Sequence, residues 1–81
     1  MSESIVITTE QLEKKIQEQI PSVSYVKAVD LTDGCGGKFE IEIISEEFRG
    51  KPLLQQHRIV HKAIEEERKH IHALTLKTKA P

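Results

Sequence analysis

In the segment KFEIEII, charged and apolar side chains alternate over residues 38–43. A period of two is the spacing of a β-strand, because successive side chains point to opposite faces of the sheet. The apolar positions, which we expect to face a core, are Phe39, Ile41 and Ile43. The charged positions are expected to face solvent. A sheet with one apolar face must be covered on that face by other elements.

The preceding residues predict a helix and a further strand. Thr8 and Gln11 have the spacing of a capping box, and Pro21 ends the helix. Between them one apolar stripe is formed by Leu12, Ile16 and Ile20. Residues 22–31 predict a strand with imperfect alternation, with Val26 and Ala28 on one side and, on the other, Val23, Tyr25, Lys27, Val29 and Leu31. The segment TDGCGG, residues 32–37, has turn composition and predicts a hairpin with a long loop.

The C-terminal half predicts a second helix and a last strand. Residues 45–52 read as an irregular link with room for one helical turn, and Pro52 suits the first position of a helix. That helix, long or broken, is expected over 53–70, with a buried face of Leu53, Leu54, Val60, Ala63 and Ile64. Residues 72–78 predict a strand that places on one face His72, Leu74 and Leu76.

This order of elements predicts an α+β domain: a three-stranded mixed sheet with helices on one face. The chain has 81 residues, which is the size of one domain with one core. We expect the domain to span 1–81, with residues 1–6 as a flexible N-terminus and 78–81 as a flexible tail. Such a chain has little room for a deep substrate pocket, and no catalytic pair is visible, so an enzyme is not expected.

Composition and charge indicate a cytoplasmic protein with a partner. One cysteine excludes an internal disulfide framework, and we see no signal peptide and no apolar run of membrane length. The nucleus stays open as a second location. The net charge of −1 is unevenly spread: residues 1–50 carry five Lys or Arg and ten Asp or Glu, whereas residues 51–81 carry seven and three. This asymmetry favours a partner, and a homodimer stays open.

Cys35 and His72 are the residues best suited to bind a metal. Glycines flank Cys35, so that backbone N–H groups can turn toward a thiolate, the form of cysteine that binds metal. The alternative is an inert small residue in a turn; a nucleophile would need a neighbouring base. His72 is expected at the edge of the core, where a strand end fixes its direction. Alone, it would also suit a structural histidine.

The other histidines favour ordinary roles. His57 and His61 are one helical turn apart, as in two-histidine metal faces, but the H-E-x-x-H pattern is absent. We interpret both as partly buried helix residues with ordinary hydrogen bonds, and His70 as the end of the helix.

Cys35 and His72 cannot complete a metal site by themselves. A structural zinc site takes about four protein ligands. An iron–sulfur cluster also takes about four. If this pair binds metal, a second polypeptide must supply the remaining ligands.

The sequence GCGG also fits G-x-x-G, the backbone clamp of KH modules, which bind nucleic acid. In those modules the clamp joins two helices, whereas here it lies between two predicted strands. Between the predicted helical segments stand three consecutive acids, Glu65 to Glu67, which would repel phosphate. A nucleic-acid role would depend on basic residues that we interpret as a solvated face, namely Arg58, Lys62, Lys69, Lys77 and Lys79.

Two segments, FRGKPLLQQHRIVHKAI and IHALTLKTKAP, resemble the BolA family in their F-x-G, H-R-x-V and His-Ala-Leu elements. The loop DGCGG is similar to that of the cytosolic, cysteine-containing branch, whose members partner monothiol glutaredoxins of the CGFS type. The resemblance implies an α-β-β-α-β fold of the KH type II kind without its G-x-x-G.

The resemblance also implies a non-enzymatic adaptor that shares a 2Fe-2S cluster with the glutaredoxin. The glutaredoxin would supply its active-site cysteine and a bound glutathione. This chain would supply His72, with Cys35 either as a further ligand or as a residue that shapes the interface. The implied role is iron-dependent regulation or cluster delivery in the cytosol. A DNA-binding transcriptional regulator, a role attributed to some bacterial relatives, is the alternative.

Overall fold

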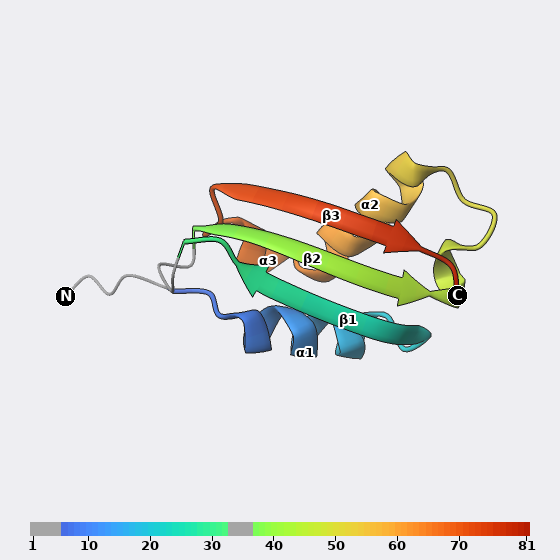
Figure 1. Ribbon diagram of the computed structural model, residues 1–81, viewed down its shortest axis with the longest axis horizontal. Coiled ribbons are helices and arrows are strands. Elements are labelled where there is room, and N and C mark those ends of the chain that lie inside the picture. The colour runs from blue at the N-terminus through green and yellow to red at the C-terminus, as the bar shows by residue number, and fades with distance from the viewer. Residues whose placement is uncertain (1–5, 33–36) are drawn as a thin grey trace.

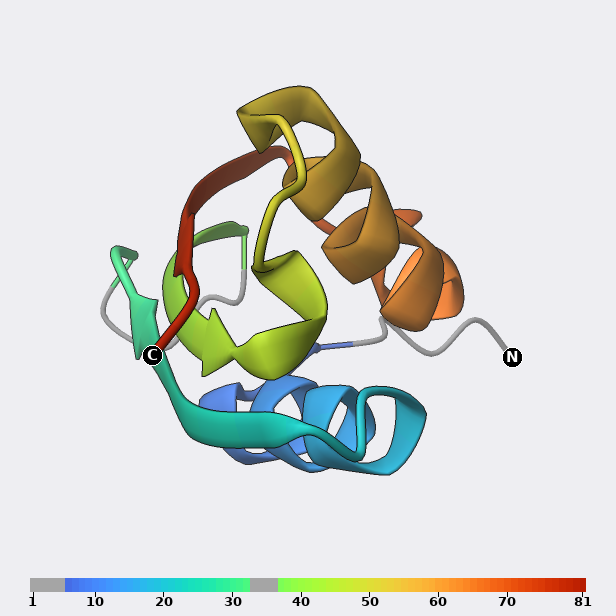
Figure 2. The same ribbon diagram turned by 90° about the vertical axis from the view of Figure 1, so that its right-hand side faces the viewer.

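The structure, a computed structural model, describes residues 6–32 and 37–81. Its elements are, in chain order, α1 (Thr9–Gln19), β1 (Val23–Asp30), β2 (Lys38–Ser45), the 3-10 turn η1 (Glu46–Phe48), α2 (Leu53–Ala63), α3 (Glu65–Arg68) and β3 (Ala73–Lys79). The strands form one sheet in the order β1-β2-β3, with β1 antiparallel and β3 parallel to β2. The helices cover one face of this sheet (Figures 1 and 2). The predicted α+β fold with a mixed sheet is therefore confirmed.

The core lies between α1, α2 and the inner face of the central strand. Phe39, Ile41 and Ile43 of β2 are fully buried, as their alternation predicts. The predicted stripe of α1 is also buried: Leu12, Ile16 and Ile20. Both halves of the capping box are present, since Gln11 N–H donates to Thr8 Oγ1 at 3.1 Å and Thr8 N–H donates to Gln11 Oε1 at 2.8 Å. These bonds satisfy two N–H groups that a helix start leaves free.

The predicted faces of β1 need one correction. The pairing with β2 shifts between Val23 and Tyr25, so that Val23 lies opposite Ser45 and Tyr25 opposite Ile44. Val23 therefore packs against the core, whereas Tyr25 is exposed on the open face. An irregularity of this kind inserts a residue and moves the following side chains to the other face. It explains the imperfect alternation of the segment.

The predicted buried face of the second helix is wrong at its first turn. Val60, Ala63 and Ile64 are buried, but Leu53 is 58% exposed and Leu54 is 62% exposed. Both leucines belong to the first turn of α2, and the buried residues of this helix, Val60 and Ala63, come later in it. The burial therefore begins only in the later turns of the helix.

Three boundaries differ from the expectation by a few residues. Pro52 precedes α2 as its N-cap and is not its first residue. The helix breaks at Ile64, and α3 ends at Arg68, two residues before His70. β3 includes Thr78 and Lys79, so the strand extends into the segment that we expected to be a tail. Among the described residues, no helix is long and apolar enough to cross a membrane.

Candidate functional site

His72 is held at the point where β3 joins the sheet. Its backbone N–H donates to the Gly37 carbonyl at 2.7 Å, and Ala73 N–H donates to the same carbonyl at 3.2 Å. The parallel register begins directly after this contact, with Lys38 opposite Ala73. The chain entering β2 and the chain entering β3 are therefore bonded together at His72.

The imidazole of His72 is exposed and stands against Gly37. A Cβ atom added to Gly37 would lie 3.3 Å from His72 Cδ2, which is tighter than most contacts of a real side chain. Glycine at this position leaves room for the ring. Within residues 6–32 and 37–81, neither ring nitrogen forms a hydrogen bond. A ring that is exposed and has no protein partner can offer a nitrogen lone pair to a ligand outside the chain.

Cys35, the other predicted ligand, lies outside the described residues, but both flanks of its loop are described. The carboxylate Asp30 Oδ1 accepts bonds from Thr32 N–H at 2.7 Å and from Thr32 Oγ1 at 2.6 Å. Thr32 Oγ1 also accepts a bond from Gly37 N–H at 3.4 Å. The Thr32 hydroxyl thus links the two ends of the loop, and the Gly37 end contacts His72. The chain entering and leaving the Cys35 loop is therefore tied to the His72 position.

His72 shares a cavity of about 230 Å³ with His61 and Arg68, and Ile71 and Leu74 complete its lining. The pKa of His61 is lowered, first by burial and then by the positive charge of Arg68 and by His57. Arg68 was not expected beside His72. The helix breaks at Ile64, between His61 and Arg68, so helical spacing alone does not place these two side chains together.

The described residues do not form a complete metal site. No group of three or more His, Cys, Asp and Glu side chains among them is arranged to hold a metal ion. A metal bound at His72 would need further ligands from outside the described residues.

The predicted partial burial of His57 and His61 is confirmed, since both are half-buried. The ordinary hydrogen bonds expected of them are absent among the described residues, and the Nε2 atom of His57 is buried without a partner there. His70 is exposed and lies beyond the end of α3. His57 lines a cavity of about 250 Å³ together with Leu53, Leu76 and Thr78.

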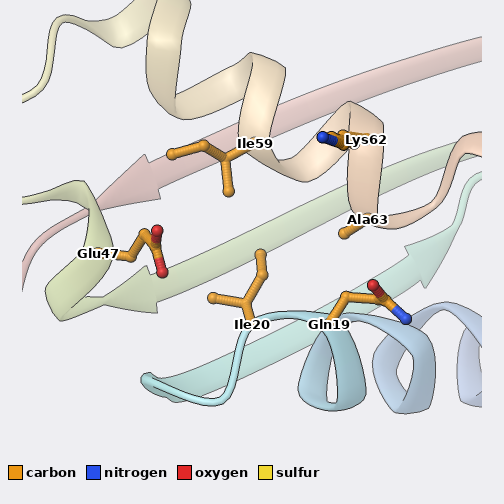
Figure 3. Close-up of a pocket in the computed structure, with 6 residues that line it drawn as sticks. All are labelled: Gln19, Ile20, Glu47, Ile59, Lys62 and Ala63. Atoms are coloured by element: carbon orange, nitrogen blue, oxygen red, sulfur yellow. The ribbon is translucent and has the colours of Figure 1, made fainter.

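A separate cavity of about 290 Å³ lies between α1, η1 and α2 (Figure 3). Its apolar side chains are Ile20, Ile59 and Ala63, and its polar side chains are Gln19, Glu47 and Lys62. Figure 3 shows Glu47 and Lys62 on opposite sides of it. It shares no residue with the His72 cavity and contains no pair of groups placed for acid–base or nucleophilic chemistry.

The helical junction gives no support to a KH-type clamp. α2 and α3 meet at Ile64 with no glycine between them, and α3 begins with Glu65, Glu66 and Glu67. Acidic side chains favour the start of a helix but repel a phosphate. The DNA-binding alternative is therefore not favoured.

Comparisons with known proteins agree with this architecture. The family described as "BolA-like protein" matches residues 7–81. The protein BOLA2 of Arabidopsis thaliana is 43% identical over 72 residues, which cover 89% of this chain and 76% of that protein. BolA-like protein 2 of Homo sapiens is 38% identical over 76 residues, which cover 93% of this chain and 87% of that protein. Other relatives are longer, and the chain spans 59% of BolA-like protein 2 of Saccharomyces cerevisiae.

Solved structures show the same fold. A crystal structure of a Bol-like protein from Babesia bovis has a TM-score of 0.84 at 33% identity, covering 98% of this chain and 91% of that one. The solution structure of yeast Fra2 has a TM-score of 0.78 at 38% identity, and the match covers 91% of this chain and 80% of that one. With its sequence and its fold both matched over nearly the whole length, the chain belongs to the BolA-like family.

Proposed function

We propose that this protein is a non-enzymatic iron–sulfur adaptor. It forms a heterocomplex with a monothiol glutaredoxin and shares with it a glutathione-ligated 2Fe-2S cluster. The observation that carries the proposal is the imidazole of His72, which is exposed and has no hydrogen bond among the described residues. The backbone N–H of the same residue is bonded to Gly37, at the flank of the Cys35 loop. Membership of the BolA-like family supports the same role.

The chemistry of the donor set accounts for the need of a partner. His72 would donate one nitrogen to iron, and Cys35 is the candidate for a second donor from this chain. The glutaredoxin cysteine and the glutathione thiol would supply the remaining ligands, which brings the total to about four. Replacing a thiolate by a neutral imidazole removes negative charge from the cluster and raises its reduction potential. The cluster in the heterocomplex would then differ from one held by the glutaredoxin alone.

The role that follows is to relay or sense cluster supply in the cytoplasm, in iron regulation or in cluster delivery. The protein would act by binding. Its own contribution is to hold an imidazole at a fixed sheet margin with the lone pair accessible.

The test mixes the purified protein with a cluster-loaded monothiol glutaredoxin and follows the visible absorption and circular dichroism. The wild-type protein is expected to change both spectra. His72→Ala should abolish the change, whereas His70→Ala, which removes an exposed histidine two residues away, should leave it intact. The Cys35→Ser variant then decides whether the thiol is a ligand. If the His72→Ala variant changes the spectra as the wild type does, His72 is not a ligand of the cluster.

A further inference from the structure

Two separate cavities lie where α2 and β3 approach each other, and we call the two cavities together the groove. The Thr78 hydroxyl of β3 donates to Gln56 Oε1 of α2 at 2.7 Å and joins the two elements. On α2, Leu53, His57 and His61 are spaced four residues apart and so lie on one face. On β3, His72 and Leu74 line one cavity. The other cavity is lined by Leu76, Lys77, Thr78 and Lys79. One cavity of about 250 Å³ lies beside Leu53 and Leu76, and the other, of about 230 Å³, lies beside His61 and His72. Figure 1 shows α2 and β3 running side by side.

The strand that borders the groove has a free edge. β3 lies at the end of the sheet and pairs only with β2. In a parallel ladder, alternate residues direct their N–H and C=O groups away from the neighbouring strand. Across residues 6–32 and 37–81, no backbone hydrogen bond connects Leu74–Lys79 to anything outside the sheet. Such an edge is a template for another strand.

The opposite edge of the sheet is partly closed. On β1, Ala28 N–H donates to the carboxylate Oε2 of Glu13, a residue of α1, at 2.9 Å. A side chain therefore occupies a backbone donor that a further strand would need. This difference between the edges makes β3 the better place for strand addition.

The groove is apolar and contains a buried donor or acceptor without a partner. Leu53 and the adjoining Leu54 are the two most exposed large apolar side chains of the described residues. His57, which lines the same cavity as Leu53, has a buried Nε2 atom that makes no hydrogen bond within the described part of the chain. A buried polar atom of this kind is stabilised when a ligand supplies its hydrogen bond.

The charges along the groove favour an acidic occupant. Lys79 at one end and Arg68 at the other form no ion pair within the described residues. Lys77 is paired with Glu40 at 2.7 Å. Glu42 is the one carboxylate among the residues that line either cavity. Two unpaired cations beside an apolar floor complement a segment that combines carboxylates with apolar side chains.

We infer that this groove receives an extended acidic segment of the glutaredoxin, which adds a strand to the free edge of β3. The inference rests on the proposed function, because the groove ends at His72 and a partner that completes the cluster must approach there. Backbone bonds would give affinity, and side chains set into the two cavities would give specificity. The docking surface is therefore larger than the ligand site.

The experiment compares groove variants with a control on the open face of the sheet. Leu53→Glu and Lys79→Glu change exposed groove positions, whereas Val29→Glu makes the same kind of change on β1, and circular dichroism checks that each variant folds. The affinity for the cluster-free glutaredoxin is measured by calorimetry. Since a buried apolar anchor or a charge reversal at an interface is worth about a factor of 10 or more, the groove variants should bind at least about tenfold more weakly and the control about as wild type. In the wild-type complex, hydrogen exchange at the amides of residues 73–79 should slow.

Each other outcome overturns the inference in a recognisable way. If the wild type and the groove variants bind the glutaredoxin with equal affinity, the groove is not the docking site, but the proposed function stands. If the wild type does not bind the cluster-free glutaredoxin, the inference about the groove is wrong, and the spectral test with the cluster-loaded glutaredoxin decides the proposed function separately. Weaker binding without slower exchange in β3 would exclude strand addition. If the groove variants instead lose self-association in sedimentation, or binding to duplex DNA, while the glutaredoxin still binds, the occupant is a second copy or a nucleic acid.

Discussion

At the residue scale, His61 should make the stability of the protein dependent on pH. Burial and the charge of Arg68 lower its pKa, so the folded state binds a proton less readily than the unfolded state does. As the pH falls through about 6.5, the unfolded chain gains that proton first and the free energy of unfolding decreases. The loss levels off below the folded-state pKa. His61→Gln should therefore lose less stability than wild type between about pH 7.5 and pH 5.

Urea unfolding at several pH values measures this difference, and an NMR titration of the imidazole reports the pKa of His61 directly. A titration midpoint at or above the ordinary histidine value would contradict the prediction. So would equal losses of stability in wild type and His61→Gln, because the carboxylates of the chain titrate alike in both proteins.

The residues of the candidate site were predictable to different degrees. His72 could be placed at a strand start because its neighbours alternate and the His-Ala-Leu element resembles a family motif. Arg68 could not, because the helix breaks at Ile64 and helical spacing then no longer relates Arg68 to the residues of α2. The role of Gly37 is also absent from local patterns, since its contact with His72 joins two strands that are far apart in the sequence.

At the scale of one element, the capping box at the start of α1 should be measurable in isolation. Thr8→Ala removes the oxygen that accepts a bond from Gln11 N–H, and it should lower the free energy of unfolding by about 1 kcal/mol. Thr9→Ala is the matched control, because Thr9 is the next residue and its hydroxyl forms no hydrogen bond among the described residues. Equal losses of stability in the two variants in urea would show that the cap contributes nothing of its own.

Local pattern predicted the elements well where it agreed with tertiary packing. α1 and β2 follow their periodicities closely, because each has one face against the core and one against solvent. In β1 the register shift between Val23 and Tyr25 depends on the pairing with β2, which no periodicity contains. In α2, Leu53 and Leu54 continue an apolar pattern beyond the part of the helix that the core covers. Apolar character at these positions fits the groove that we assign to a partner.

At the scale of the whole molecule, stability should depend on β2, because this strand pairs with both neighbours and carries much of the core. Ile41 is fully buried on it, and Ile41→Ala should cost about 2 to 5 kcal/mol through the lost contacts and the cavity that remains. A domain of this length has roughly 4 to 12 kcal/mol of stability in total, so the variant should be partly unfolded at moderate temperature or in low urea.

Leu54→Ala distinguishes this account from one based on apolar pattern alone. A leucine in a buried stripe would cost nearly as much as Ile41 when truncated. Because Leu54 is 62% exposed, we expect its truncation to change the free energy of unfolding by no more than about 0.5 kcal/mol. Urea unfolding of Ile41→Ala, Leu54→Ala and the wild type measures the loss in the free energy of unfolding for each variant. A large loss in Leu54→Ala would mean that the first turn of α2 packs against the core after all, and the groove beside β3 would then be closed to a partner.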